Sequence, residues 1–292
     1  MQLNRSFLFT PGNHARRVEK SFTTGADAVI LDLEDAVAVS EKLATRATVV
    51  QALQQPRPCR GYVRVNGIET VFCFDDIEAV VGPWLDGIVL PMAERAADLQ
   101  IVDWMLSNLE RRLDLESGTI DLMPIIETAR GLAAAREIAA STVRVKRLSF
   151  GGGDYTRDLN LMWTFGEEEI ASARAAVVLA SRLACIESPI DTVFIHIKEH
   201  DRFARSAQKG REFGFQGKLC IHPDQVTATN AAYTPTADEA QWARKIISSF
   251  AAAEAQGLAS IQIDGYFVDY PIVEKAQRIV DLYDAVEAAV PR

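Results

Sequence analysis

Residues 28–65 of the chain read AVILDLEDAVAVSEKLATRATVVQALQQPRPCRGYVRV, and this stretch decides the fold. It holds a continuous apolar run at Ala28–Leu33, a segment with helical spacing at Ser40–Leu53 and a second short run at Gly61–Val65. Apolar runs without polar alternation are typical of strands that are buried on both faces. Two such strands joined by one helix are predicted to pair in parallel, because a parallel connection needs a crossover.

The same unit recurs along the chain up to residue 232. Eight strand–helix pairs predict an α/β fold, a (β/α)8 TIM barrel over residues 1–232. An open, doubly wound parallel sheet alternates in the same way and stays as the alternative. Residues 233–292 contain a long helical stretch, Thr236–Gln256, and are expected to form a C-terminal helical extension of the barrel. The predicted strands are Ser6–Thr10, Ala28–Leu33, Gly61–Val65, Gly87–Leu90, Leu122–Ile126, Arg147–Phe150, Thr192–Ile195 and Lys218–Ile221.

The composition is that of an acidic globular protein. The 292 residues include 31 Lys and Arg against 40 Asp and Glu, a net charge of −9, and 48% are hydrophobic. This charge argues against nucleic acid or an anionic membrane as a partner, because their phosphates would be repelled. The N-terminal apolar patch is too short for a signal peptide, and no apolar run is long enough for a membrane helix. With four scattered cysteines and no export signal, the sequence predicts a reduced, cytoplasmic protein.

Polar residues follow most of the predicted strands. In a barrel, the loops at the C-terminal ends of the strands build the active site, so these side chains are expected to meet on one rim. Any one acid could instead cap the next helix. The residues after the strands are Asp32, Glu34, Asp35, Arg64, Asn66, Glu127, Asp154, His196 and His222.

Glu127 and Asp154 are the candidate metal ligands. Each ends an apolar strand, where an unpaired carboxylate in low dielectric is costly. Two carboxylates without nearby cysteine favour a hard cation, and Mg²⁺ fits best because it binds one or two carboxylates, waters and substrate oxygens. The glycines at 151–153 would let a ligand approach the backbone and could offer N–H groups to an anion.

Arg64 is the candidate carboxylate clamp, because its planar guanidinium binds a carboxylate through two hydrogen bonds. The alternative is a structural salt bridge to Glu34 or Asp35. The histidines have no metal-binding spacing and are interpreted as hydrogen-bonded residues at the barrel end, and Lys198 is a poor Schiff-base candidate.

Several motifs together resemble one known family. They run in order over nearly the whole chain: Arg5-Ser-Phe-Leu-Phe-Thr-Pro-Gly12, Asp32-Leu-Glu-Asp-Ala-Val37 with Lys42 and Arg46, Tyr62-Val-Arg-Val-Asn66, Pro124-Ile-Ile-Glu127, Ser149-Phe-Gly-Gly-Gly-Asp-Tyr155, Gly217-Lys-Leu-Cys-Ile-His-Pro223 and Tyr266-Phe-Val-Asp-Tyr-Pro271. These motifs are similar to those of the citrate lyase β-subunit-like family, which belongs to the HpcH/HpaI aldolase superfamily and includes citryl-CoA, malyl-CoA and citramalyl-CoA lyases.

The resemblance implies a Mg²⁺-dependent barrel that assembles as a homo-oligomer, a trimer or hexamer. It implies that Glu127 and Asp154 hold the metal, and that Glu127 and Arg64 contact the substrate. It also implies that Asp269 acts as acid/base from a C-terminal lid that closes over a neighbouring subunit. The chain departs from the family at Met92, where a Lys often follows the Leu-Pro after the fourth strand. We expect this change to alter substrate choice.

The reaction implied is cleavage of a carbon–carbon bond in a 3-hydroxyacyl-CoA thioester, giving acetyl-CoA or a homologue and a 2-oxo acid. Three alternatives remain: a malyl-CoA-type thioesterase, a CoA-independent hydroxy-acid aldolase, and a non-catalytic paralogue or subunit. Arg5, Arg16, Lys42 and Arg46 are candidates to contact the CoA phosphates, and each could equally be a solvated charge.

Overall fold

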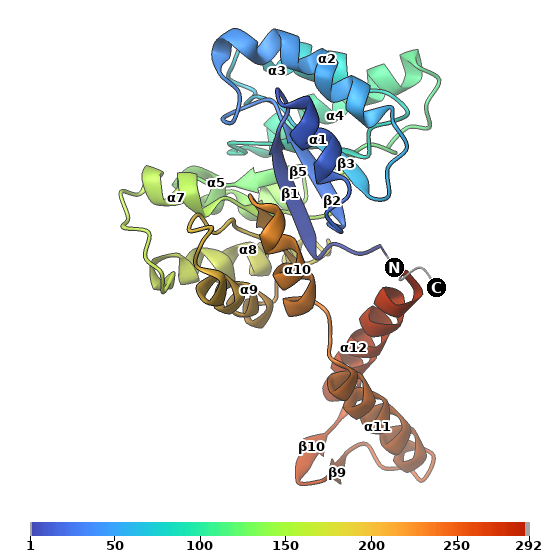
Figure 1. Cartoon of the computed structure of the whole chain (residues 1–292). Coiled ribbons are helices and arrows are strands. Elements are labelled where there is room, and N and C mark those ends of the chain that lie inside the picture. The colour runs from blue at the N-terminus through green and yellow to red at the C-terminus, as the bar shows by residue number, and fades with distance from the viewer. Residues whose placement is uncertain (1, 290–292) are drawn as a thin grey trace. The chain divides into compact units, whose positions relative to one another are not determined.

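The computed structural model describes residues 2–289 (Figure 1). The chain divides into two compact units. One comprises residues 4–230, and the other comprises residues 231–289 together with residues 2–3. Each unit is described by itself below.

The first unit is a closed barrel of eight parallel strands in sequence order, with β8 pairing back onto β1. Closure confirms the predicted TIM barrel and excludes the open sheet, which would leave two edge strands. The strands are β1 (Ser6–Pro11), β2 (Ala28–Asp32), β3 (Arg60–Arg64), β4 (Gly87–Leu90), β5 (Asp121–Ile126), β6 (Ser149–Phe150), β7 (Ile190–Asp191) and β8 (Gly217–Cys220).

Helices surround the strands of this unit (Figure 1). Strand residues are therefore buried on both faces, as the apolar runs predicted. The barrel interior contains Phe7, Ala28, Ile30, Tyr62, Val89, Met123, Ile125, Ile190 and Leu219. The helices are α1 (Ala15–Ser21), α2 (Lys42–Leu53), α3 (Cys73–Val80), α4 (Ala96–Arg112), α5 (Ala129–Ala133), α6 (Ala135–Ala139), α7 (Gly152–Asp158), α8 (Ala171–Leu183), α9 (His200–Phe213) and α10 (Pro223–Ala232), with short 3₁₀ turns η1 (Val39–Glu41) and η2 (Glu168–Ile170).

The seventh strand was predicted in the wrong place. The prediction was Thr192–Ile195, whereas β7 comprises Ile190 and Asp191 and pairs with β8 through these two residues. The chain leaves the ladder at Thr192, whose hydroxyl accepts a hydrogen bond from the Gly152 N–H at 2.7 Å. A charged residue inside a strand does not fit an apolar pattern, which is why the predicted strand begins only after Asp191.

Asp191 is tolerated in the barrel because two cations neutralise it. Lys218 Nζ donates to Asp191 Oδ2 at 2.8 Å, and Arg174 Nε donates to Asp191 Oδ1 at 2.9 Å. All three side chains are fully buried. The two cations lower the pKa of Asp191 despite the opposing effect of burial. A second buried network joins Arg147, Asp121 and Tyr62.

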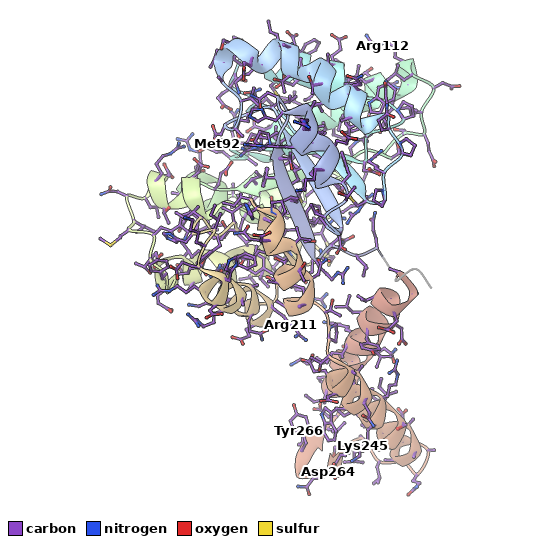
Figure 2. The ribbon with its side chains drawn as sticks, viewed as in Figure 1. Met92, Arg112, Arg211, Lys245, Asp264 and Tyr266 are labelled. Atoms are coloured by element: carbon purple, nitrogen blue, oxygen red, sulfur yellow. The ribbon has the colours of Figure 1, made fainter. Side chains whose placement is uncertain are left out.

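The second unit is a pair of long helices, α11 (Ala237–Glu254) and α12 (Tyr270–Ala289), with an antiparallel hairpin of β9 (Ile261–Ile263) and β10 (Tyr266–Val268) between them. The turn is Asp264-Gly265, both at positive φ, which suits a tight hairpin. Figure 2 shows Asp264 and Tyr266 at this hairpin, where Lys245 of α11 donates to Asp264 at 2.6 Å. Ile246, Phe250, Val268, Ala276 and Val280 belong to the apolar core of this unit.

The four cysteines are free thiols. Within residues 2–289, no helix is both long and apolar enough to span a membrane.

Candidate active site

The C-terminal ends of β2, β3, β5 and β6 place an arginine among several acids. Asp32 and Arg64 are the last residues of β2 and β3 and are paired in the sheet register. Glu127 directly follows β5, and Gly151 directly follows β6. The sequence-predicted residues Arg64, Glu127 and Asp154 thus lie at one mouth of the barrel, where α/β barrels carry their active sites.

Arg64 is held rigidly by two carboxylates. Its Nε and Nη2 donate to Asp32 at 2.8 and 2.6 Å, and its Nη1 lies 2.9 Å from Glu34 Oε2. The guanidinium also stacks on the Phe9 ring at 4.8 Å. The predicted salt bridge between Arg64 and Glu34 is therefore present. The main partner of Arg64, however, is Asp32, which accepts two hydrogen bonds from it. Burial lowers the pKa of Arg64, but Asp32 and Glu34 outweigh burial and raise it.

Glu127 is buried and lies among other acids. The Met92 N–H donates to its Oε1 at 2.7 Å. Burial raises the pKa of Glu127 to about 8, an effect opposed by the Met92 hydrogen bond and by Arg64 and increased by Asp154 and Glu34. Burial likewise raises the pKa of Glu34 to about 7. Both shifts come first from burial, and the neighbouring carboxylates add to them.

Met92 positions Glu127 through its backbone. Its φ of +51° is in the left-handed region, which is unfavourable for a residue with a side chain. This conformation accompanies the N–H bond to Glu127. Met92 is labelled on the barrel in Figure 2. The sequence reasoning missed this role, since a strained backbone at a methionine has no side-chain signature.

The glycine run begins a helix, α7, and two of the three N–H groups that were expected to be offered to an anion have partners within the barrel. The Gly151 N–H donates to the Ile126 carbonyl at 3.0 Å, and the Gly152 N–H donates to Thr192. These two donors are therefore already used. Gly151 serves another purpose, because a Cβ there would lie 2.4 Å from Glu127 Oε2. Its missing side chain makes room for the carboxylate.

Asp154 lies in the first turn of α7 and is 26% exposed at its side chain. Arg157, exposed at 72%, pairs with it at 2.8 Å. Such an exposed pair is weak and can be exchanged for another cation. Asp154 acts electrostatically on both Glu127 and Glu34, so the three carboxylates share one site.

Two carboxylates here suit a hard cation that keeps waters and takes oxygens from a substrate. Among residues 2–289, no three His, Cys, Asp or Glu side chains are arranged to hold a metal ion. Glu127 and Asp154 would supply two oxygen ligands, the number typical of Mg²⁺ in enzymes that bind anionic substrates. A divalent cation would also offset the smaller part of the Glu127 pKa shift, the part that comes from Asp154 and Glu34.

Other predicted residues have structural partners. Asn66 Nδ2 donates to Asp76 and to the Leu33 carbonyl. The His196 ring lies against Phe165 and Phe194. His222 accepts a hydrogen bond from the Asp224 N–H at 3.3 Å. His222 therefore has a hydrogen bond, as the sequence predicted for both histidines, whereas the contacts of His196 are with aromatic rings.

A cavity of about 390 Å³ also lies at this mouth, between the ends of β1 and β8 and helix α1. Two cations that the sequence reasoning passed over, Arg17 and Lys20, line it. Three of the four predicted phosphate-contacting residues are engaged elsewhere: Arg5 with Asp27, Lys42 with the Leu33 and Glu34 carbonyls, and Arg46 with Asp76.

Asp269 belongs to the second unit. It precedes α12, and its Oδ1 accepts a hydrogen bond from the Ile272 N–H at 3.4 Å. The half-buried carboxylate therefore acts as a helix N-cap.

The closed barrel with an arginine and paired acids at its C-terminal mouth defines an enzyme of the α/β-barrel class. Residues 5–223 match the family model of the HpcH/HpaI aldolase/citrate lyase family, and the chain belongs to this family.

Relatives cover almost the full chain. It is 34% identical to "Citrate lyase subunit beta" of Leuconostoc mesenteroides subsp. cremoris, over 97% of this chain and 94% of the relative. It is 31% identical to "L-malyl-CoA/beta-methylmalyl-CoA lyase" of Cereibacter sphaeroides, over 98% and 96%. These matches confirm the resemblance and the predicted enzyme class, a carbon–carbon lyase.

Solved structures match as well. Protein CitE of Mycobacterium tuberculosis, solved with magnesium, acetoacetate and coenzyme A, superposes with a TM-score of 0.80 at 27% identity, over 97% of this chain and 98% of that chain. The same protein was also solved with magnesium and pyruvate. These structures support a divalent metal in this group of proteins.

Proposed function

We propose that this chain is a Mg²⁺-dependent cytoplasmic lyase that cleaves a 3-hydroxyacyl-CoA thioester into acetyl-CoA, or a homologue, and a 2-oxo acid. The observation that carries the proposal is the buried Glu127 beside Asp154 and the clamped Arg64 at the barrel mouth. The names of the relatives agree with this chemistry, and the CitE structure contains magnesium, acetoacetate and coenzyme A together.

Glu127 and Asp154 would hold the metal. When bound, Mg²⁺ supplies Lewis acidity and a template for the carboxylate and adjacent oxygen of the substrate. The Met92 N–H fixes the Glu127 carboxylate, and Gly151 leaves room for it. Binding would require loss of the Glu127 proton, because the folded protein favours the neutral acid below about pH 8.

Arg64 would bind the oxo-acid part and stabilise negative charge on the oxygen that becomes the carbonyl. Asp32 and Phe9 keep the guanidinium in place before the substrate arrives. A donor fixed in advance needs no reorganisation during the reaction. Glu34 Oε2 lies 2.9 Å from Arg64 Nη1, so a substrate carboxylate would compete with Glu34 for this donor.

Asp269 would serve as the acid that protonates the departing thioester enolate, and as the base in the reverse direction. Its hairpin unit exposes Tyr266, Phe267 and Tyr270. Exposed aromatic residues on a two-helix unit suit a lid that closes on another surface and excludes water. We assign that surface to a neighbouring copy in a homo-oligomer, a trimer or hexamer.

Arg17 and Lys20 would contact the CoA phosphates. They line the cavity beside β1 and β8, and among residues 2–289 neither has an ion-pair partner. Available cations at the barrel mouth are suitable for a phosphate-rich cofactor portion of the substrate.

The decisive experiment incubates the purified protein with Mg²⁺ and citryl-, malyl- or citramalyl-CoA and follows 2-oxo acid and free thiol separately. We expect 2-oxo acid without thiol from one of these thioesters. Thiol alone identifies a thioesterase. Turnover of a free hydroxy acid without CoA identifies an aldolase, and no product from any substrate favours the non-catalytic reading.

A variant connects the result to the site. Asp154→Ala should abolish Mg²⁺-dependent turnover while the unfolding transition stays near that of the wild type, because Asp154 is partly exposed and its ion pair with Arg157 is weak. Full activity of this variant would refute the metal assignment. Arg157→Ala is the matched control, since it removes the partner of Asp154 and leaves the carboxylate.

A further inference from the structure

Helix α7 carries the proposed metal ligand Asp154 in its first turn and is only seven residues long. A helix this short is not stable by itself in water, because the cost of its first turn is not repaid by further hydrogen bonds. The position of Asp154 therefore depends on the contacts that hold α7 against the rest of the barrel unit. Two such contacts lie at the two ends of the helix.

The first contact is at the start of α7 and comes from Thr192, the residue that follows β7. The Thr192 side chain is fully buried, and its hydroxyl oxygen accepts a hydrogen bond from the Gly152 N–H at 2.7 Å. A Cβ at Gly152 would lie 2.9 Å from the same oxygen, so the missing side chain lets the helix begin this close to Thr192. The bond ties the backbone two residues before Asp154 to the end of β7.

The second contact is at the last residue of α7, Asp158. Its Oδ2 accepts a hydrogen bond from the Ala129 N–H at 2.8 Å, which connects α7 to the start of α5 (Figure 1). Ala129 is the first residue of α5 and lies two residues after Glu127. The first N–H groups of a helix have no acceptor within the helix, so a carboxylate is favourable at this point.

The spacing of the two aspartates determines what the second contact does. Asp154 and Asp158 are four residues apart, so they lie on the same face of α7. The bond from Ala129 to Asp158 therefore turns this face toward the segment that carries Glu127. Asp154 acts electrostatically on Glu127, which agrees with this orientation. Together, the two contacts fix the rotation of α7 and the place of its first turn.

We propose that Thr192 and Asp158 are positioning residues for the divalent metal, holding α7 so that Asp154 and Glu127 can bind the same cation. Neither side chain would contact the metal itself. This role rests on the metal site of the proposed function. Residues that orient metal ligands from behind typically change metal affinity by about 10–100-fold when they are lost.

The test is the Kd of Mn²⁺, which shares the preference of Mg²⁺ for carboxylate and water oxygens. Free Mn²⁺ is followed by electron paramagnetic resonance while the full-length protein is titrated without substrate. Asp158→Ala and Thr192→Val each remove an acceptor and should raise the Kd by about tenfold or more. Asp158→Asn and Thr192→Ser keep an acceptor oxygen and should retain most of the affinity. Asp158→Asn also separates the hydrogen bond of Asp158 from its charge.

Urea unfolding shows whether a variant has lost its fold instead of its metal site. Asp158 is exposed, so Asp158→Ala should remain folded. Thr192→Val leaves the buried Gly152 N–H without this acceptor and should be less stable. Asp158→Ala alone decides the question if Thr192→Val does not fold. Glu137→Ala, which removes an exposed acid of α6, is the control and should bind Mn²⁺ as the wild type does.

The positioning role is overturned if Asp158→Ala binds Mn²⁺ as tightly as the wild type. It is also overturned if Asp158→Asn loses as much affinity as Asp158→Ala, because charge would then be the cause. A wild type that does not bind Mn²⁺ overturns the metal site and the positioning role together. A wild type that binds Mn²⁺ but cleaves no thioester contradicts the lyase reaction alone, since the readout here is metal binding.

Discussion

Replacing Gly151 by alanine should disable the site through one methyl group. The new Cβ would lie 2.4 Å from Glu127 Oε2, 2.6 Å from Glu127 Cβ and 2.8 Å from Ile125 Cγ2. Ordinary contact begins at 3.4 Å, so the carboxylate must move by about 1.0 Å (3.4 − 2.4). A displacement of about 1 Å in a reacting group costs about 100-fold in rate, and overpacking costs about 1–3 kcal/mol of stability.

The assay is kcat at saturating Mg²⁺ with whichever thioester the incubation experiment shows to be cleaved, together with urea unfolding. Gly153→Ala is the matched control, since its nearest neighbour is a Trp163 ring carbon at 3.4 Å. Because Gly153 lies inside α7, alanine there should raise stability by about 0.5–1 kcal/mol. If Gly151→Ala keeps kcat within about threefold of the wild type, the tight fit of Glu127 has no catalytic consequence.

Three further predictions concern charge. Without divalent metal, wild-type stability should fall relative to Glu127→Gln as the pH rises from 4.5 to about 8, because the raised pKa favours folding only while Glu127 is protonated. In urea titrations, the difference in the free energy of unfolding between the wild type and Glu127→Gln should change by up to about 1.4 kcal/mol per pH unit. Parallel pH dependences of the two proteins would contradict the prediction. Lys218→Met should lower the free energy of unfolding by about 3–5 kcal/mol, because the buried Asp191 then keeps Arg174 as its cationic partner but loses Lys218. Lys198→Met, at an exposed position, is the control, and equal melting temperatures of the two variants would refute the role of the network. Asp269→Asn keeps an N-cap acceptor for α12, so KM should stay near the wild-type value while kcat falls about 100-fold or more. An unchanged kcat would refute the acid/base role of Asp269.

The sequence predicted the barrel because its strands and helices alternate with different periods, a signal that local patterns carry. It also predicted where Arg64 and Glu127 lie, since residues that follow parallel strands share one mouth. The prediction failed at β7, where Asp191 is a strand residue only because Lys218 and Arg174 neutralise it. Such compensation joins residues far apart in the chain, and no local pattern contains it.

The sequence by itself determined the order of the elements, the acidic charge and the residue types at the strand ends, because each depends on neighbours in the chain. Only the tertiary structure decided how those residues are tuned: Asp32 rather than Asp35 clamps Arg64, the Met92 backbone fixes Glu127, and Gly151 leaves room for the carboxylate. Packing sets these relationships by bringing distant segments within hydrogen-bond distance and by removing water, which is also why the pKa of Glu127 rises.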